Sequence, residues 1–546
     1  MPSMRYTSVE RNRRHRISRT LLGPSSLLSL VARPLNYIAR CCLALAALMP
    51  ATALSASDSD LYRNVEAYQS KHETQIVEEL VELVRVRSVA ADPAGLEAAA
   101  NLLVKKLEAR GFDATQWTSE AGGAPLVFGT LSGSGAKRTV VFYAHYDGQP
   151  VTPSQWSSDP FVPSLHSATP ATEANQVNWT SAQPHFDPEW RLFGRAVADD
   201  KASIVAFLAA IDALKAVGRQ PSVNIKVVWE GEEEAGSTHL AQILRDHQAM
   251  LGADLWLIGD APVHQSGRAM LYFGARGTLG LRMTLYGPIK ALHDGHYGNW
   301  VPNPAALAAQ LIAQMRAQDG TILIPGFAES VRALTPDERT ALTQLPKVDD
   351  SLKRQFGIGA SEGNEELALS LMRPALNIRG LRSGQVGDAS ANAIPTDAEI
   401  SIDFRLVPDQ TPQMVQAAVE RFLTSRGWTL LANEPDEATR LAHPHLVRLE
   451  WEPGYPALRS SMSTTVARAV IGTATRAARG PVAVMPMMGA SVPLYLFAEI
   501  FHAPVIGLPI VNYDDNQHAA NENLRLGNLW EGIKTYTAIL SHRPPS

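Results

Sequence analysis

Residue types that bind divalent metal ions occur at several places in the sequence, each directly after an apolar run or in a turn. They are His145-Tyr-Asp147, the pair Asp199-Asp200, Asp260, the acidic run Glu230-Gly-Glu-Glu-Glu234, and Asp514-Asp-Asn-Gln-His518. Imidazole nitrogens and carboxylate oxygens are ligands for zinc and for harder divalent ions. The cysteines, Cys41 and Cys42, both lie near the N-terminus. A metal bound elsewhere in the chain must therefore be held by His, Asp and Glu.

Each of these segments also has an ordinary structural explanation. Asp199 and Asp200 precede an expected helix, where they would cap its N-terminus and favour its dipole. The run 230–234 could be a solvated turn, although a bound cation would relieve the repulsion among its carboxylates. A single His-x-Asp is weak evidence, even though Asp147 could hold the imidazole nitrogen of His145 that does not face a metal. The metal hypothesis depends on these segments meeting in space.

Alternating strand and helix patterns provide a way for them to meet. Apolar runs predict buried strands at 139–143, 223–229 and 255–258, and amphipathic patterns predict helices at 72–86, 94–110 and 202–214. This alternation is typical of an α/β architecture with a largely parallel sheet. In such sheets ligands bind beyond the carboxyl ends of the strands, which is where the candidate residues lie.

The pattern changes in the middle of the chain and then returns. Residues 278–286 and 398–407 alternate as antiparallel strands do, and 304–315 and 412–423 are helical. Helix and strand patterns of the first kind resume at 463–478, 505–508 and 529–540. We therefore predict one α/β domain made of 57–274 and 456–546, interrupted by an inserted α+β domain at 275–455. The polar, Pro- and Thr-rich stretch 164–188 is predicted to be a surface loop.

The N-terminal segment has the features of an export signal. Residues 1–40 contain eight arginines and one acid, Glu10, and are followed by the apolar run Cys41–Leu48 and by small residues up to Ala56. We interpret 1–56 as a signal peptide cleaved near Ala53 or Ala56, because the apolar run is too short to span a bilayer. The expected location is periplasmic or secreted.

Composition narrows the function further. A hydrophobic content of 45%, a charged content of 19% and a net charge of −5 fit a globular protein without the basic field of many nucleic-acid binders. Removing the basic segment makes the remainder more acidic still. We expect no nucleic-acid partner, and no membrane partner once the signal is removed.

Taken together and in this order, the motifs resemble the co-catalytic di-zinc metallopeptidases, a family that includes carnosinase, glutamate carboxypeptidase, acetylornithine deacetylase, succinyl-diaminopimelate desuccinylase and aminoacylase. The likeness covers about 75–541 and is greatest to the carnosinase-type dipeptidases. It is carried by Trp156-Ser-Ser-Asp-Pro-Phe161, Glu230-Gly-Glu-Glu-Glu-Ala-Gly-Ser237, Phe404-Arg-Leu-Val-Pro408 and Asp514-Asp-Asn-Gln-His518. The resemblance implies a zinc-peptidase catalytic domain with a mostly parallel central sheet, and an inserted lid or dimerisation domain.

The resemblance also implies roles for single residues. Two zinc ions per subunit, or cobalt or manganese, would be held by His145, Asp199, Glu234, Asp260 and His518, with Asp199 bridging the ions. Asp147 would orient His145. Glu233 would be the general base that takes a proton from a metal-bridging water and passes it to the leaving amine. Ala196 departs from the family pattern, which has glycine there.

Four further residues match the family's substrate contacts. They are His293, Asn392, Arg405 and Ser491. Arg405 would hold a terminal carboxylate through its guanidinium fork, and Ser491 lies in a turn that contacts the substrate. His293 would reach into the active site of a partner subunit, so the resemblance implies a homodimer.

Two activities remain open at this point, together with a third function without catalysis. The first is an exported dipeptidase or carboxypeptidase that cleaves next to a free carboxylate. The second is an N-acyl-amino-acid deacylase that uses the same site on a different substrate. The third is a non-catalytic binding protein on a decayed peptidase fold, which the complete set of ligands and Glu233 argues against.

Overall fold

A computed structural model describes residues 56–179 and 185–542. The predicted signal peptide, apart from Ala56, lies outside the described residues. Within the described part, none of the helices combines the length and apolar character needed to cross a bilayer.

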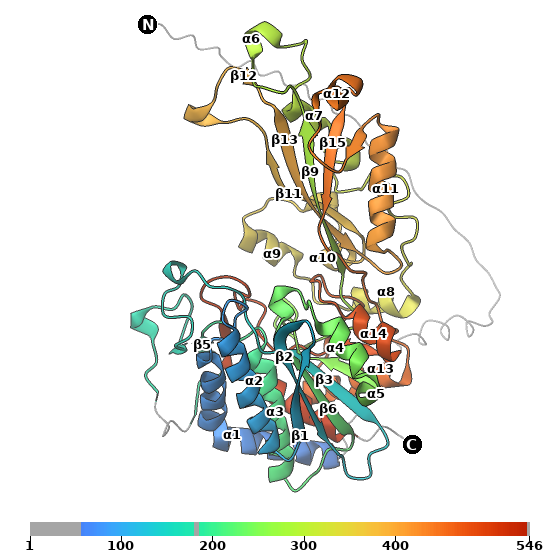
Figure 1. The fold of residues 1–546 in the computed structure, drawn as a ribbon. Coiled ribbons are helices and arrows are strands. Elements are labelled where there is room, and N and C mark those ends of the chain that lie inside the picture. Colours follow the sequence, from blue (N-terminus) through green and yellow to red (C-terminus); the bar gives the residue numbers. More distant parts are fainter. Residues whose placement is uncertain (1–55, 180–184, 543–546) are drawn as a thin grey trace, which may run out of the picture. The chain divides into compact units, whose positions relative to one another are not determined.

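The catalytic part is built on an eight-stranded mixed sheet (Figure 1). In spatial order its strands are β1 (Asp113–Ser119), β2 (Gly122–Leu131), β6 (Asn224–Glu230), β3 (Thr139–His145), β7 (Leu255–Ile258), β17 (Val505–Gly507), β8 (Met270–Tyr272) and β16 (Ala483–Met485). The central strands β6, β3, β7 and β17 run parallel, as does β8 with β16. The hairpin β1–β2 and the β17–β8 contact are antiparallel. The predicted α/β class with its inserted α+β domain is confirmed.

Helices cover both faces of this sheet. They are α1 (Ala56–Arg85), α2 (Pro93–Glu108), α3 (Lys201–Ala216), α4 (Leu240–Asp246), α5 (Gln248–Leu251), α13 (Thr465–Ala477), α14 (Tyr495–Phe501) and α15 (Leu526–Ser541). Strand β3 shows how the two faces differ, because its successive side chains point to opposite sides. Phe142 packs in the core with α3 and α15, whereas Tyr143 packs in the core with α4 and α14.

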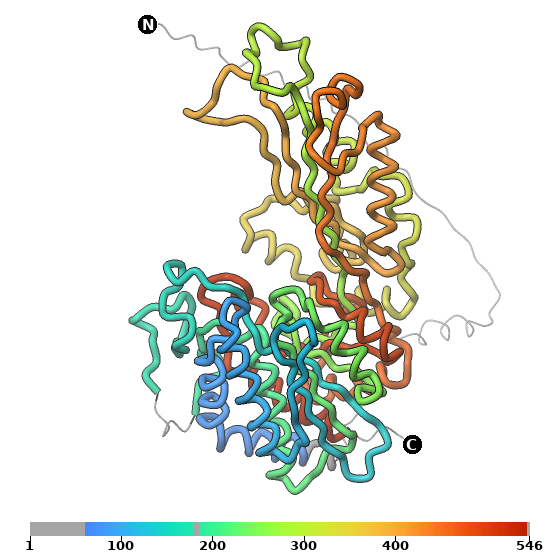
Figure 2. The backbone as a smooth tube through the Cα atoms, viewed as in Figure 1, coloured from blue at the N-terminus to red at the C-terminus, as the bar shows by residue number. Residues whose placement is uncertain are grey.

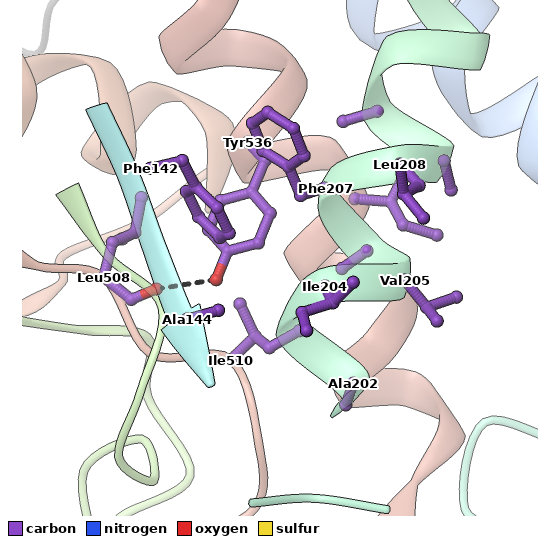
Figure 3. Packing of buried hydrophobic residues seen from close by; sticks show 14 of the residues in the cluster. Phe142, Ala144, Ala202, Ile204, Val205, Phe207, Leu208, Leu508, Ile510 and Tyr536 are labelled. Atoms are coloured by element: carbon purple, nitrogen blue, oxygen red, sulfur yellow. Dashed lines mark hydrogen bonds between the residues drawn. The ribbon is translucent and has the colours of Figure 1, made fainter. Parts of the chain in front are cut away.

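Aromatic packing fixes α3 and α15 against β3. Phe207 on α3 stacks on Phe142 with ring centroids 4.4 Å apart, and the Tyr536 ring meets Phe142 edge-on at 5.1 Å. Figure 3 shows the Tyr536 hydroxyl donating a hydrogen bond to the Leu508 carbonyl, at 3.1 Å. Burying a side chain of this size contributes about 1.5–3 kcal/mol. This core holds the N-terminal end of α3 next to the ends of the central strands.

The inserted domain has its own five-stranded sheet and core. Its strands, in spatial order, are β11 (Ala375–Arg382), β13 (Asp397–Leu406), β9 (Gly277–Tyr286), β15 (Leu446–Trp451) and β14 (Thr429–Leu431). Figure 2 shows the green segment that contains β9 running beside the orange segments of β13 and β15. Leu281 and Ile402 face a shared core with the helices on this sheet, so the domain folds around apolar residues of its own.

Short helices and a two-stranded pair complete the inserted domain. They are β10 (Leu292–His293), β12 (Ala393–Ile394), α6 (Asp294–Tyr297), α7 (Pro304–Met315), α8 (Pro336–Thr343), α9 (Asp349–Phe356), α10 (Leu367–Ser370), α11 (Pro412–Ser425) and α12 (Glu437–Ala442). The start of α7 follows from its sequence. Asn303 accepts hydrogen bonds from the amides of Ala305 and Ala306, and Pro304 occupies the first helical position.

The predicted surface loop 164–188 contains regular structure, so that prediction was wrong in part. Strand β4 (Ser164–His166) pairs with β5 (Arg191–Phe193), which pairs with β18 (Asn523–Arg525) in a three-stranded sheet. Residues 180–184 of the stretch lie outside the described part. The Pro- and Thr-rich composition hid β4 because the strand is only three residues long and has no alternation to detect.

Candidate metal centre and active site

The pairing of β3 with β7 places two predicted ligands, His145 and Asp260, side by side at the carboxyl end of the sheet. Tyr143 of β3 lies opposite Ile258 of β7, so His145 and Asp260, each two residues further on, leave the sheet together. On the other side of β3, His145 lies opposite Glu230, the last residue of β6. The chain then turns into a short 3-10 helix, Glu233–Ala235, that carries Glu233 and Glu234. The carboxyl ends of three parallel strands therefore supply one site.

Asp199 lies between the two histidines of the site. Its Oδ1 is 2.9 Å from Nε2 of His145, and its Oδ2 is 3.1 Å from Nε2 of His518. Oε2 of Glu234 lies 3.2 Å from the same nitrogen of His518. The structure thus brings all five predicted ligands together. Two groups with donor atoms within 4.8 Å of one another result: His145, Asp200 and Asp260 in one, and Asp199, Glu234 and His518 in the other.

The Asp147 carboxylate contacts both His145 and the turn that carries Glu233 and Glu234. Its Oδ1 lies 3.3 Å from Nδ1 of His145, the ring nitrogen that does not face Asp199. The same carboxylate accepts hydrogen bonds from the amides of Glu233, at 3.3 Å, and Glu234, at 3.0 Å. Asp147 therefore has the orienting position expected of it, and it also fixes the turn that carries the proposed general base.

Burial and mutual repulsion make ionisation of these acids costly. Burial raises the pKa of Asp260 to about 6 and that of Glu234 to about 7, with Asp199 as the next contribution to each. Removal from solvent also raises the pKa of Glu233 well above its usual value. Burial acts on Asp199 in the same direction, but the hydrogen bonds of His145 and His518 outweigh it and lower its pKa. The cluster contains more negative charge than its own cations can balance.

This arrangement fits divalent metal ions. Buried carboxylates with raised pKa values that converge on two imidazoles need an external positive charge to ionise together. The nitrogen and oxygen donors suit zinc, and also cobalt or manganese. His145, Asp199, Asp260, Glu234 and His518 are the residues that would hold such ions.

Two acidic residues of the centre, Asp200 and Glu522, were left without a site role by the sequence. Asp200 occupies the N-cap position of α3 but makes no side-chain capping bond, and it is buried next to Asp260 and His145. The closeness of Asp200 to Asp260 and His145 could have been foreseen only from the register of β3 and β7. Glu522 is fully buried and binds the backbone of the segment that ends in Asp199. A single glutamate four positions after His518 gives no signal of that kind.

Arg405 and Ser491 form a second part of the site. Nη1 of Arg405 donates to the Ser491 hydroxyl at 2.7 Å, and Nε of Arg405 donates to Asp403 at 2.8 Å. Burial raises the pKa of Tyr455, the charge of Glu233 raises it further, and the charge of Arg405 lowers it.

His293 and Asn392 lie elsewhere in the chain's own fold. His293 ends β10, is exposed, and accepts a hydrogen bond from the amide of Gly295 at 3.1 Å. The Asn392 carbonyl accepts from the amide of Asp294 at 3.1 Å, and Asn392 directly precedes Ala393 of β12, which pairs with His293. The structure brings them to each other but not to the metal cluster.

Comparison with known proteins agrees with this geometry. The model of peptidase family M20/M25/M40 matches residues 141–542, which is more than half of the chain. The chain belongs to this family. As an M20/M25/M40 peptidase it is a metal-dependent hydrolase, and the predicted family resemblance is confirmed.

Several M20 relatives match over most of their length. A Cys-Gly metallodipeptidase of Schizosaccharomyces pombe is 26% identical over 419 residues, 76% of this chain and 81% of the relative. The human Beta-Ala-His dipeptidase is 24% identical over 429 residues, 76% of each chain. Among solved structures, an M20 family metallo-carboxypeptidase from Sulfolobus solfataricus is 27% identical with a TM-score of 0.69, covering 85% of this chain and 98% of that one. Human carnosine dipeptidase 1, at 22% identity and a TM-score of 0.65, shares the fold.

Proposed function

We propose that this peptidase hydrolyses dipeptides, or releases the last residue of short peptides, at the peptide bond next to a free C-terminal carboxylate. The observation that carries the proposal is the Arg405–Ser491 pair, in which the guanidinium donates to the serine hydroxyl at 2.7 Å. A guanidinium binds a carboxylate through two parallel hydrogen bonds, and the adjacent hydroxyl supplies a third donor. Binding the terminal carboxylate there would place the last peptide bond near Glu233 and the metal cluster.

The chain's own residues perform the proton transfers in this reaction. Bound divalent ions would polarise the peptide carbonyl and lower the pKa of water. Glu233 is the group that accepts a proton from the attacking water and delivers it to the leaving amine. Burial raises its pKa, so its carboxylate is a stronger base than a solvated one and its acid form can still donate the proton to the amine. Asp147 keeps Glu233 in place by binding its amide.

The relatives support a small peptide as substrate. The S. pombe and human relatives are named for the dipeptides Cys-Gly and Beta-Ala-His, and the Sulfolobus structure is named as a carboxypeptidase. All of these reactions cut beside a terminal carboxylate, which is the group that Arg405 would bind.

A substrate panel with one arginine variant tests the proposal. Wild-type protein should cleave free dipeptides roughly 100-fold better than the same dipeptides with a C-terminal amide, because a hydrogen-bonded charge contributes about 1.5–3 kcal/mol. Arg405→Met should remove that preference by slowing the free dipeptides only. N-acetyl amino acids belong in the panel, since faster cleavage of these would establish the deacylase instead. Equal rates on acid and amide with wild-type protein would overturn the proposal.

We propose that the metals are two zinc ions per subunit. The support is the pair of ligand groups joined through Asp199, with one imidazole in each. Elemental analysis of the purified protein should return two equivalents of zinc, and cobalt or manganese should restore activity after chelation. One equivalent, or another native metal, would contradict this assignment.

We also propose a homodimer formed through the inserted domain. Strand β11 is at the edge of the five-stranded sheet, and on it Leu381 is exposed. Trp300 and Val386 are also exposed apolar residues of this domain. A dimer would cover them and would explain why His293 and Asn392 are held together away from the chain's own cluster.

Export of the protein with removal of 1–56 is likewise our proposal. It is supported by the eight arginines, the short apolar run and the small residues before Ala56. Mass spectrometry of the N-terminus, after fractionation of the source cells, should find a mature protein that begins near residue 54 or 57. An intact N-terminus in the cytosolic fraction would contradict it.

A further inference from the structure

The carboxylate of Glu522 is buried and receives four hydrogen bonds from one short segment. Oε1 accepts from the amides of Ala198, at 2.9 Å, and Asp199, at 3.0 Å. Oε2 accepts from the amide of Ala196, at 2.9 Å, and from Nη1 of Arg195, at 2.8 Å. Glu522 has no exposed side-chain surface, so water does not compete for these donors.

The segment held in this way ends in the carboxylate between the two histidines. Asp199 reaches both His145 and His518, so small shifts of its backbone change both distances. Within the segment, Ala196 has a φ of 61°, in the left-handed region that favours glycine. Glu522 binds the amide of this residue, and thereby holds a backbone shape that the local sequence does not favour.

Arg195 connects the same unit to the histidine on the other side. Its Nη2 donates to the carbonyl of Ala519, the residue after His518, at 3.0 Å. Its guanidinium also lies over the Trp156 ring, 5.0 Å from the centroid. Glu522 and Arg195 together therefore bind the backbone on both sides of the Asp199–His518 contact.

We propose that the buried Glu522–Arg195 pair is a positioning unit that sets the Asp199–His518 geometry and so tunes metal affinity. Neither residue is placed to touch substrate, and both act through Asp199 and His518. The inference rests on the proposed function, because it assumes that these two residues bind metal. Partners that orient metal ligands typically change metal affinity or activity 10–100-fold when they are replaced.

Glu522→Gln tests the unit with almost no change in volume. The amide keeps one acceptor oxygen but turns an NH₂ group toward two donors, so at least two of the four bonds are lost. Titration of the metal-free, full-length protein with Zn²⁺ against a chromophoric chelator should show at least one site weakened 10-fold or more. The absorption spectrum of the Co²⁺ form should change as well. At saturating zinc, kcat should fall while KM stays near the wild-type value.

Glu338→Gln is the matched control. Glu338 forms another buried ion pair, with Nε of Arg459 at 2.9 Å, in a part of the fold that contains no predicted ligand. This variant should lower the melting temperature but bind zinc with wild-type affinity. If Glu522→Gln does not fold, the zinc affinity of Arg195→Lys is measured instead. Lysine keeps the positive charge but lacks the planar guanidinium whose two nitrogens donate to Glu522 and to the Ala519 carbonyl. A lysine variant with weakened zinc binding supports the inference.

The outcomes separate the two proposals. If the wild-type protein binds zinc and Glu522→Gln binds it equally tightly, the pair has a structural role only and the positioning role is overturned. Arg195→Lys replaces Glu522→Gln in this comparison if the glutamine variant does not fold. A wild-type protein that binds no divalent ion overturns the proposed function itself.

Discussion

Glu233 lies on the turn that follows β6, where Asp147 binds its amide. Burial raises the pKa of Glu233, and the carboxylates of Asp260, Asp199 and Glu234 raise it further. A carboxyl group in these surroundings is a better base than one in water, because its conjugate acid is weaker. Neighbouring Glu232 differs completely. Its carboxylate binds the amide of Ala124 and the ring of His239.

The difference between these adjacent glutamates gives a direct test. Glu233→Gln should lower kcat by about 10²–10⁴-fold, because general acid–base catalysis contributes about that much, while zinc affinity stays within a few-fold of the wild-type value. Steady-state kinetics on a dipeptide, together with zinc titration, measure both quantities. Glu232→Gln is the control and should keep at least a third of the wild-type kcat. A Glu233→Gln enzyme within tenfold of wild type would assign the base elsewhere.

At the level of residues, the sequence predicted the candidate ligands but not what holds them. His145, Asp199, Asp260, Glu234 and His518 could be chosen because their types and their places after apolar runs match a family pattern. Asp200 and Glu522 could not, since their environment depends on register and on chain segments far apart in the sequence. Charge does not distinguish Glu233 from the adjacent glutamates of the run 230–234, and the family resemblance was needed to assign it as the base.

Among the elements, α3 matters most for the site because Asp199 and Asp200 directly precede it. The helix is buried along most of its length, and Phe207 anchors it to β3 through the stack on Phe142. A second contact of Phe207, edge-on to Trp229 at 6.2 Å, ties the helix to β6. The strands that carry His145 and the Glu233 turn are therefore packed on the helix that follows Asp199.

Removing the Phe207 ring should weaken this assembly. We expect Phe207→Ala to lower the free energy of unfolding by about 3–5 kcal/mol, since a large cavity would open in a packed core. Phe207→Leu, which fills most of the space, should cost less than about 1.5 kcal/mol. Urea denaturation followed by circular dichroism measures both. A loss below 1 kcal/mol for the alanine variant would mean that α3 is held mainly by other contacts.

How well the elements could be predicted depended on their length and pattern. The prediction matched β7 at 255–258 and α7 at 304–315, because a bounded apolar run and a capped amphipathic pattern leave few alternatives. Strand β4 was missed because three residues cannot show a period. The order of strands in each sheet followed from no local pattern, because pairing is decided by contacts between distant segments.

For the whole molecule, the surplus of buried acids links metal content, pH and stability. The pKa of Glu234 and Glu230 is raised to about 7 and that of Asp260 to about 6, chiefly by burial. The folded, metal-free protein thus binds protons more tightly than the unfolded chain, in which these groups titrate near pH 4. Stability should therefore fall as pH rises from about 4 to about 7. Asp199, with its lowered pKa, loses its contribution only at more acidic pH.

Thermal melts with chelator or with zinc check this linkage. The melting temperature of the metal-free protein should decrease between pH 5 and pH 7, and the increase produced by saturating zinc should grow over the same range, because zinc competes with protons for the ligands. Glu234→Gln should flatten the metal-free profile. A metal-free melting temperature that rises over this range would contradict the ionisation pattern.

The proposed dimer makes a prediction at the same scale. Leu381→Glu on the edge strand β11 should convert the dimer to a monomer in light scattering, and should lower activity because His293 would no longer reach a partner's site. Met250→Glu is the control, since Met250 is a comparably exposed apolar residue on α5 of the catalytic part. A wild-type protein that is fully active as a monomer would exclude this role for His293.

The order of the centre's residues along the chain has a consequence for biosynthesis. A ribosome that has translated the whole inserted domain has already produced His145, Asp199, Glu234 and Asp260, but neither His518 nor Glu522. A chain of that length lacks the second imidazole, His518, and the carboxylate of Glu522 that binds the segment ending in Asp199. We therefore expect peptidase activity to arise only after residues 518 and 522 have been made, so that chains released earlier are inactive.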